Sequence, residues 1–281
     1  MTGPPTTTAD LPQPGHRTLA VPGANLAVVE VGDAEAPGWL VAHGAGSSSR
    51  FVVRVLAAAV LRAGRRLVTY DLRGHGASSP ARRPLDHHLD VHAADLAHVA
   101  ASGGDALEVI GGISLGGHAA VRAVGDGARC EVALACLPAW TGRAVPHQGP
   151  HAAIAARVRE VGVAGHLAAV GDDPDLPPWL RRALLADLTR HDPASLQAVL
   201  TSLEGGLAPT AEEVAGLPVP LAVVGWPDDP GHPLEVAERW ASSVPGGHLA
   251  VASMAAMATG VEHLGAVVVA AVDGARRGSA V

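Results

Sequence analysis

The stretch Gly112-Ile113-Ser114-Leu115-Gly116-Gly117 decides the fold of this chain. It has the pattern G-x-S-x-G and stands between a strand-like run, residues 108–113, and a helix-like run that reaches about residue 124. A turn this tight strains the serine backbone and accepts only small residues two positions before and after it. It lifts the Ser114 hydroxyl clear of the sheet edge, where the helix dipole and the N–H of Leu115 can stabilise an oxyanion. The alternative interpretation is a glycine-rich turn whose serine only caps a helix.

Strand and helix patterns alternate outward from this stretch. Near-continuous apolar strands separated by helices are typical of a mostly parallel sheet covered on both faces. Between about residues 138 and 217 only helical patterns occur, which predicts a block lying over the edge of the sheet where ligands bind. The expected strands are 26–31, 39–42, 66–70, 108–113, 131–136, 221–225 and 249–253, and the expected helices are 51–63, 90–101, 114–124, 152–163, 177–190, 193–203, 210–215, 233–243 and 261–277.

These patterns divide the chain into three parts. Residues 1–15 are rich in Thr and Pro and have no apolar signal-peptide core, so we expect a disordered leader. Residues 16–137 and 218–281 are expected to form one α/β core. Residues 138–217 are expected to form a helical cap inserted into it.

The composition excludes several classes of protein. Apolar residues make up 48% of the 281, which is enough for a sizeable core, and the net charge of −7 argues against a nucleic-acid binder. All 20 basic residues are Arg, which rules out a Lys Schiff base or a P-loop lysine. No apolar run approaches the ~20 residues that span a bilayer, so no membrane partner is expected. Without a dinucleotide, phosphate or metal fingerprint, the sequence predicts a small-molecule substrate and no cofactor.

The two cysteines indicate a reducing compartment. Cys130 and Cys136 lie six residues apart in a strand-like run, and an extended step of that length spans about 20 Å, too far for a disulfide. Two thiols alone also cannot build a structural zinc site. We therefore interpret both as reduced core residues and expect a cytoplasmic protein.

Two further segments extend the pattern around Ser114. His43-Gly44-Ala45-Gly46 follows a strand and can offer a second N–H, from Ala45, to the same oxyanion, while Asp71–Ser78 (DLRGHGAS) follows the next strand. Together with GISLGG these segments resemble the α/β-hydrolase family, and the resemblance extends over residues 17–277. It implies a serine hydrolase or esterase with a mostly parallel eight-stranded sheet, helices on both faces and an inserted helical cap. It also implies loop-supporting roles for His43 and His75, although His43 stays with Ala45 and Leu115 among the oxyanion and substrate-binding candidates.

The resemblance places the acid in the loop that follows the strand at residues 221–225. That loop contains two aspartates, Asp228 and Asp229. The D-P-x-x-P ending resembles the family pattern best with Asp229 as the acid. The alternative is a polar turn that caps the next helix.

The base departs from the family pattern. The resemblance implies a histidine shortly after the last strand, but that position is Met257, and methionine cannot accept a proton. His263, in the first turn of the last helix, is the preferred substitute. His232 is second, because a separation of three residues from the acid is poor geometry for reaching Ser114, and His248 begins the last strand at its far end. A site without a catalytic histidine is the remaining alternative.

Two functions follow as hypotheses. The first is a serine hydrolase that cleaves a carboxylic ester, thioester or lactone of a small apolar molecule, with Ser114, His263 and Asp229 as its catalytic residues. The second is a binding protein, or a non-hydrolytic cyclase, isomerase or lyase, on the same fold. The second is motivated by Met257, because a serine hydroxyl is a weak nucleophile without a neighbouring base.

Overall fold

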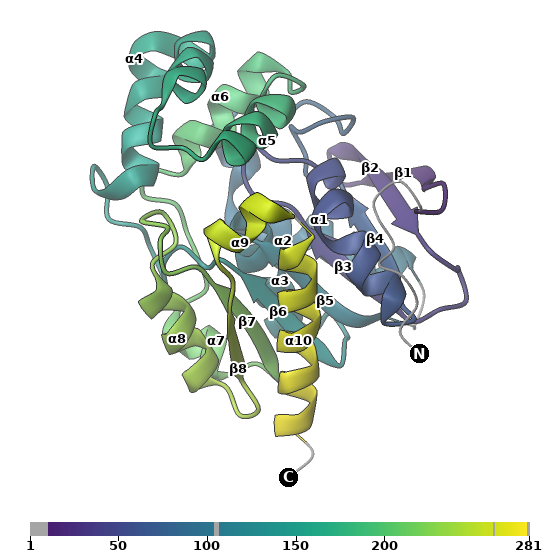
Figure 1. Cartoon of the computed structure of the whole chain (residues 1–281). Coiled ribbons are helices and arrows are strands. Elements are labelled where there is room, and N and C mark those ends of the chain that lie inside the picture. Colours follow the sequence, from purple (N-terminus) through teal and green to yellow (C-terminus); the bar gives the residue numbers. More distant parts are fainter. Residues whose placement is uncertain (1–10, 104–106, 261, 280–281) are drawn as a thin grey trace.

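A computed structural model describes residues 11–103, 107–260 and 262–279 (Figure 1). Within them, eight strands form one sheet in the order β1-β2-β4-β3-β5-β6-β7-β8. Strand β2 runs antiparallel to β1 and β4, and the pairings from β4 to β8 are all parallel. The strands are β1 (Gly15–Val21), β2 (Ala24–Val31), β3 (Gly38–Ala42), β4 (Arg66–Tyr70), β5 (Leu107–Ile113), β6 (Val132–Cys136), β7 (Leu221–Gly225) and β8 (His248–Val251).

Helices cover both faces of the sheet because the central strands are apolar on both sides. Consecutive residues of β5 point to opposite faces of the sheet. Val109 packs on the face covered by α1 (Ser49–Arg62) and α10 (His263–Gly278), and Ile110 packs on the other face. The second face carries α2 (Leu89–Ser102), α3 (Leu115–Gly125) and α8 (Leu234–Ser243). This arrangement confirms the predicted fold class.

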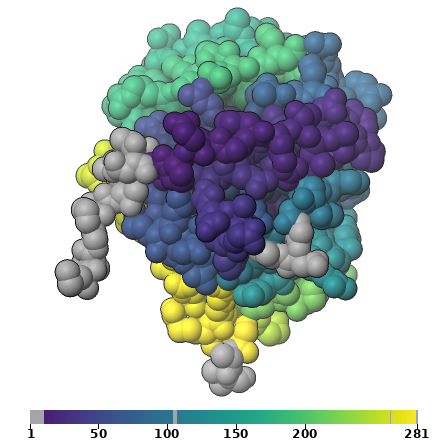
Figure 2. Space-filling view, turned by 90° about the vertical axis from the view of Figure 1, so that its right-hand side faces the viewer, coloured from purple at the N-terminus to yellow at the C-terminus, as the bar shows by residue number. Residues whose placement is uncertain are grey.

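A helical insertion follows β6 and lies over the edge of the sheet at which the parallel strands end (Figure 1). We use this term for α4 (Gly149–Asp172), α5 (Pro178–Leu188) and α6 (Pro193–Ser202). The path of α4 is interrupted at Gly162, whose φ of +69° places it in the left-handed region that glycine tolerates. The short α7 (Ala211–Ala215) packs instead on α3 and α8 of the core. Figure 2 shows the insertion, in green, resting directly on the N-terminal part of the core.

Polar contacts fasten one corner of the insertion to the core. The Ser47 and Ser48 hydroxyls both donate to Asp187 of α5, at 3.1 and 2.8 Å. Close by, the N–H of Ala81 donates to Ser195 Oγ of α6 at 3.0 Å. The loop between β3 and α1 is therefore hydrogen-bonded to the insertion.

The element boundaries differ from the sequence-based expectations in a few places. Gly15, placed in the leader by the sequence, is the first residue of β1, and the first ten residues of that predicted leader lie outside the described residues. The sequence patterns do not predict helix α9 (Met254–Thr259) or the 3-10 turn at Pro84–His87. None of the described helices is both long and apolar enough to cross a membrane.

Candidate active site

Ser114 occupies a strained bend between β5 and α3. Its φ of +51° and ψ of −118° lie in a region that residues with a side chain rarely adopt. Backbone hydrogen bonds hold it there: its N–H donates to the carbonyl of Cys136 at 2.8 Å, and its carbonyl accepts from His118 N at 2.9 Å. The bend is the one expected from the G-x-S-x-G pattern.

Two glycines make the bend sterically feasible. A Cβ on Gly112 would overlap the backbone of Gly116, and a Cβ on Gly116 would lie 2.5 Å from the carbonyl oxygen of His43. The second contact also shows that the end of β3 packs directly against the first turn of α3. The glycines therefore bring the loop after β3 next to Ser114, and a Cβ on Gly44 would lie 3.3 Å from Ser114 Cβ.

A hydrogen-bonded chain runs from Ser114 through His232 to Asp229. His232 Nε2 lies 2.9 Å from Ser114 Oγ, and His232 Nδ1 lies 2.7 Å from Asp229 Oδ2. An ionised carboxylate can only accept, so Nδ1 carries the proton, and Nε2 of the neutral ring is free to accept from the serine hydroxyl. With 17% of the His232 side chain and 20% of the Asp229 side chain exposed, solvent reaches both groups. This is the geometry of a nucleophile, a general base and an orienting acid.

The placement of His232 corrects the sequence-based expectation. The N–H of His232 donates to the carbonyl of Asp229 at 3.1 Å, which closes a turn with Pro230 and Gly231 at its centre. Gly231 N–H also donates to Asp229 Oδ1 at 2.8 Å. The turn folds the chain back on itself, so both side chains point the same way and a separation of three residues suits the pair. The Pro-Gly dipeptide was the signal that could have revealed this turn.

The structure does not bring the preferred base to Ser114. His263 lies at the start of α10, where its N–H donates to the carbonyl of Gly260, and no hydrogen bond among the described residues joins its side chain to Ser114. Met257, at the position where the family resemblance implied a histidine, is 1% exposed and part of the apolar core. His248 is exposed at the start of β8. The expectation of His263 as base is therefore wrong in its geometry.

The two aspartates of the loop have different environments. Asp228 is exposed, whereas Asp229 is partly buried and hydrogen-bonded to His232. Burial works to raise the pKa of Asp229, but the hydrogen bond and charge of His232 and the N–H of Gly231 outweigh it and hold this pKa below its ordinary value. Asp229 thus stays ionised at neutral pH and can orient the imidazole.

Two backbone donors lie near the serine. Leu115 is the first residue of α3, whose N–H has no partner within its own helix. Ala45 belongs to the loop that packs against the bend at Ser114, which we call the elbow. Within the described residues neither N–H makes a hydrogen bond, so both are free to donate to a substrate oxygen, and their role in stabilising an oxyanion stays a prediction.

Histidines that do not contact Ser114 shape the loop carrying Ala45. His43 is fully buried, donates from Nδ1 to Gly44 O at 2.7 Å and accepts at Nε2 from Leu72 N at 2.9 Å. This burial removes His43 from the substrate-binding candidates and leaves it as a loop support. His75 Nε2 accepts from Gly46 N, and His191, just before α6, bridges Gly76 N and Gly46 O, all at 2.9–3.0 Å. His75 and His191 each accept a backbone N–H at a ring nitrogen, which requires that both rings be neutral.

The helical insertion contributes an aromatic wall beside the base. The His151 ring of α4 meets the His232 ring edge-on, with centroids 5.4 Å apart, and contacts Trp140 on its other side at 5.1 Å. Burial and the nearby His232 lower the pKa of His151 to about 4, so it is neutral at pH 7. A cavity of about 170 Å³ opens beside this wall, lined also by Val145, Leu203 and the loop that carries His232.

The fold and the serine–histidine–aspartate chain define a protein of the α/β-hydrolase class. The alpha/beta hydrolase family matches residues 39–269, and the chain belongs to this family. Comparison with curated protein sequences finds no match.

Solved structures from several bacteria share the fold. The enol-lactonase of Burkholderia xenovorans LB400 superposes with a TM-score of 0.71 at 20% identity, covering 92% of this chain and 99% of its own. A hydrolase of Pseudomonas aeruginosa PA01 gives 0.69 at 22% identity, over 92% and 98%. A bromoperoxidase of Bacillus anthracis gives 0.70 at 16% identity, over 92% and 100%. At these identities the likeness shows the fold alone.

Proposed function

We propose that the protein is a serine esterase that hydrolyses a carboxylic ester, thioester or lactone of a small apolar molecule. The observation that carries the proposal is the position of His232, whose two ring nitrogens contact Ser114 Oγ and Asp229 Oδ2 at 2.9 and 2.7 Å. A serine with a base within hydrogen-bond reach, itself oriented by an acid, is the arrangement that activates a hydroxyl. Family membership supports hydrolase chemistry independently.

The reaction follows from the geometry. Ser114 Oγ attacks the carbonyl carbon while its proton passes to His232 Nε2, and Asp229 stabilises the imidazolium that forms. The N–H groups of Leu115 and Ala45 stabilise the negative oxygen of the tetrahedral intermediate. His232 then gives the proton to the leaving oxygen or sulfur, which departs with the electron pair of the cleaved bond. Water, deprotonated by the same imidazole, attacks the acyl-serine, releases the carboxylic acid and restores the Ser114 hydroxyl.

The surroundings of His232 favour small apolar substrates. The cavity beside the base loop has a volume of about 170 Å³ and walls from Trp140, Val145 and Leu203. Neither Ser114 nor His232 lines this cavity. The preference for a small apolar substrate is therefore supported only by the apolar side chains near the base loop, which favour apolar groups by removing their surface from water. The helical insertion acts in this proposal as the cap that selects the substrate.

A fluorophosphonate probe tests the serine mechanism directly. The probe reacts only with an activated serine, so intact-mass and peptide analysis of the treated wild-type protein is expected to show one adduct, on Ser114. Ser114→Ala, with unchanged circular dichroism, is expected to lose both the adduct and the hydrolysis of p-nitrophenyl butyrate. A folded wild-type protein that takes up no probe would refute the proposal and favour a non-hydrolytic or binding role for the same pocket.

A further inference from the structure

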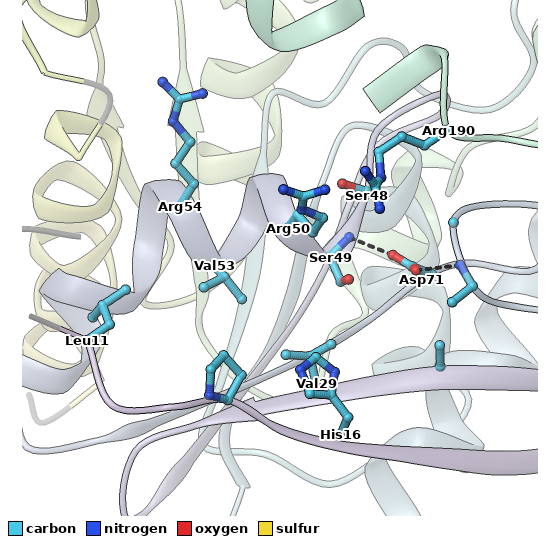
Figure 3. A pocket seen from close by; sticks show the side chains of 14 residues that line it. Leu11, His16, Val29, Ser48, Ser49, Arg50, Val53, Arg54, Asp71 and Arg190 are labelled. Atoms are coloured by element: carbon cyan, nitrogen blue, oxygen red, sulfur yellow. Dashed lines mark hydrogen bonds between the residues drawn. The ribbon is translucent and has the colours of Figure 1, made fainter. Parts of the chain in front are cut away.

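A groove crosses the outer side of α1, separate from Ser114, His232 and Asp229, which we call the triad. It has a volume of about 760 Å³ and runs between the β1–β2 edge of the sheet and the corner where the helical insertion meets the core (Figure 3). Neither Ser114 nor any other member of the triad lines it. The hydrolase proposal gives this groove no role, and a ligand in the groove would not need a catalytic Ser114.

Arginines from two parts of the chain line one end of the groove. Arg50 stands in the first turn of α1, and Arg190 follows α5 of the insertion. Both are exposed, and neither forms an ion pair or a side-chain hydrogen bond with any of the described residues. Figure 3 shows Arg190 reaching toward Ser48 and Arg50, whereas Arg54, one turn further along α1, extends away from them. Two guanidinium groups without partners, in a chain of net charge −7, are a local site for an anion.

The acidic groups nearby are already engaged by other donors. Asp71 lines the groove, but its two oxygens accept the N–H groups of Ser49 and Ala77, at 2.9 and 2.8 Å (Figure 3). Asp187, behind the groove, accepts the hydroxyls of Ser47 and Ser48. These carboxylates are buried, and no arginine lies within ion-pair distance of either one among the described residues. They leave the two guanidinium groups free at the surface.

The other end of the groove carries several apolar residues together with the polar side chains of His16 and Arg54. Leu11 and Pro14 lie before β1, Val29 belongs to β2 and Val53 to α1. Val29 and Val53 lie on the other side of α1 from Arg50 in Figure 3. A ligand that satisfies both ends must carry a charged head and an apolar tail, because a small inorganic anion leaves the apolar wall in contact with water.

We propose that this groove binds a carboxylate that carries a short apolar chain. The Arg50 and Arg190 guanidinium groups bind the carboxylate, and the apolar residues Leu11, Pro14, Val29 and Val53 contact the chain. A planar guanidinium matches a carboxylate in two parallel hydrogen bonds, which gives the head group its specificity. Arg50 belongs to the core and Arg190 to the insertion, so the ligand joins the two and stabilises their contact. Binding to the folded state alone raises the unfolding temperature as the ligand concentration rises.

Isothermal titration calorimetry with octanoate tests the proposal. The wild-type protein is expected to bind octanoate at least tenfold more tightly than acetate, which lacks the chain, and than octan-1-ol, which lacks the charge. The double variant Arg50→Gln/Arg190→Gln is expected to bind octanoate at least tenfold more weakly. Arg129→Gln, which removes the same charge from an exposed position outside the groove, serves as the matched control and is expected to stay within twofold of wild type.

The outcomes separate this groove from the triad. Ser114→Ala is expected to leave the octanoate affinity unchanged, so a failure of the hydrolase proposal does not affect the result. Equal octanoate affinity in the wild type and the double variant, with both shown folded by circular dichroism, would overturn the proposal. Acetate or inorganic phosphate binding as tightly as octanoate would overturn it as well, because the apolar wall would then contribute nothing.

Discussion

Asp229 and His232 are hydrogen-bonded across a single turn, with Oδ2 and Nδ1 2.7 Å apart. The family resemblance predicts the acid after β7 and the base after β8, on two separate loops. Here one Pro-Gly turn carries both Asp229 and His232, the acid and the base of the proposed mechanism, and the position after β8 is filled by the buried Met257. The orientation of the base therefore depends on the local backbone of residues 229–232 and not on the packing of two loops.

The first prediction separates the two candidate bases. His232→Ala is expected to lower kcat for p-nitrophenyl butyrate by about 10⁴–10⁶-fold, since removing the base of a working triad has an effect of this order. His263→Ala is the matched control, because the side chain of His263 makes no hydrogen bond to Ser114, and it is expected to stay within threefold of wild type. Steady-state kinetics at pH 7.5 decides between them. The reverse ranking would restore His263 as the base.

The second prediction concerns the acid. Asp229→Asn is expected to lower kcat by about 10³–10⁴-fold, because an amide neither stabilises the imidazolium nor fixes the tautomer with the proton on Nδ1. KM is expected to change little, since Asp229 contacts His232 and lies behind it as seen from the serine. Asp228→Asn alters an exposed neighbour and serves as the control. A comparable loss of kcat in both variants would show that kcat depends on the conformation of the loop and not on the carboxylate of Asp229.

Local patterns predict the fold and the position of Ser114, whereas they do not predict which histidine lies beside it. Six consecutive residues, 112–117, specify the elbow at Ser114, so the sequence alone predicts its position. The family order of elements places the base after β8, whereas the local signal for His232 is the turn-forming Pro230-Gly231 dipeptide. Contacts between distant segments left no local signal at all: Asp187 meets Ser48 across 139 positions of sequence, and Arg50 and Arg190 share a groove only after the insertion has docked.

The third prediction tests why the elbow requires glycine. A Cβ on Gly116 would lie 2.5 Å from the backbone carbonyl of His43, which cannot move aside as a flexible side chain can. Gly116→Ala is therefore expected to lower the free energy of unfolding by about 3 kcal/mol, the upper end of typical overpacking effects. It is also expected to abolish probe labelling of Ser114, because the loop carrying Ala45 must shift.

A glycine in the same helix provides the control. Gly125 ends α3, and a Cβ there would meet no atom within 4 Å. Gly125→Ala is expected to leave activity unchanged and to stabilise the protein by about 0.5–1 kcal/mol, because alanine loses less backbone entropy in a helix. Urea unfolding of both variants measures the difference. Similar unfolding free energies for the two would contradict the proposed clash.

The fourth prediction is a loss of stability in mild acid. Burial is the main cause that lowers the pKa of His43, His75, His92 and His191 from the ordinary 6.5. Below pH 6.5 the unfolded chain therefore takes up protons that the folded chain does not, so the free energy of unfolding falls as the pH falls. Each such histidine contributes at most about 1.4 kcal/mol per pH unit below 6.5.

His92 isolates one of these contributions. It is fully buried in α2, and neither ring nitrogen has a hydrogen-bond partner among the residues that the structure describes. His92→Leu removes both the titrating group and the unsatisfied nitrogens, so it is expected to raise the free energy of unfolding at pH 7.5 by about 1 kcal/mol. It is also expected to reduce the loss between pH 7.5 and 5.5 by about the same amount.

Urea unfolding at the two pH values measures both effects of His92→Leu. His98→Gln, which replaces an exposed histidine on the same helix, is the matched control and is expected to leave the pH-dependent loss within experimental error of wild type. A His92→Leu variant that loses as much stability as wild type between pH 7.5 and 5.5 would show that this ring does not titrate between the folded and unfolded states. The acid sensitivity would then arise at other buried rings, among them those that bind Gly46 and Gly76, where protonation at Nδ1 of His191 or Nε2 of His75 removes an acceptor from a backbone N–H.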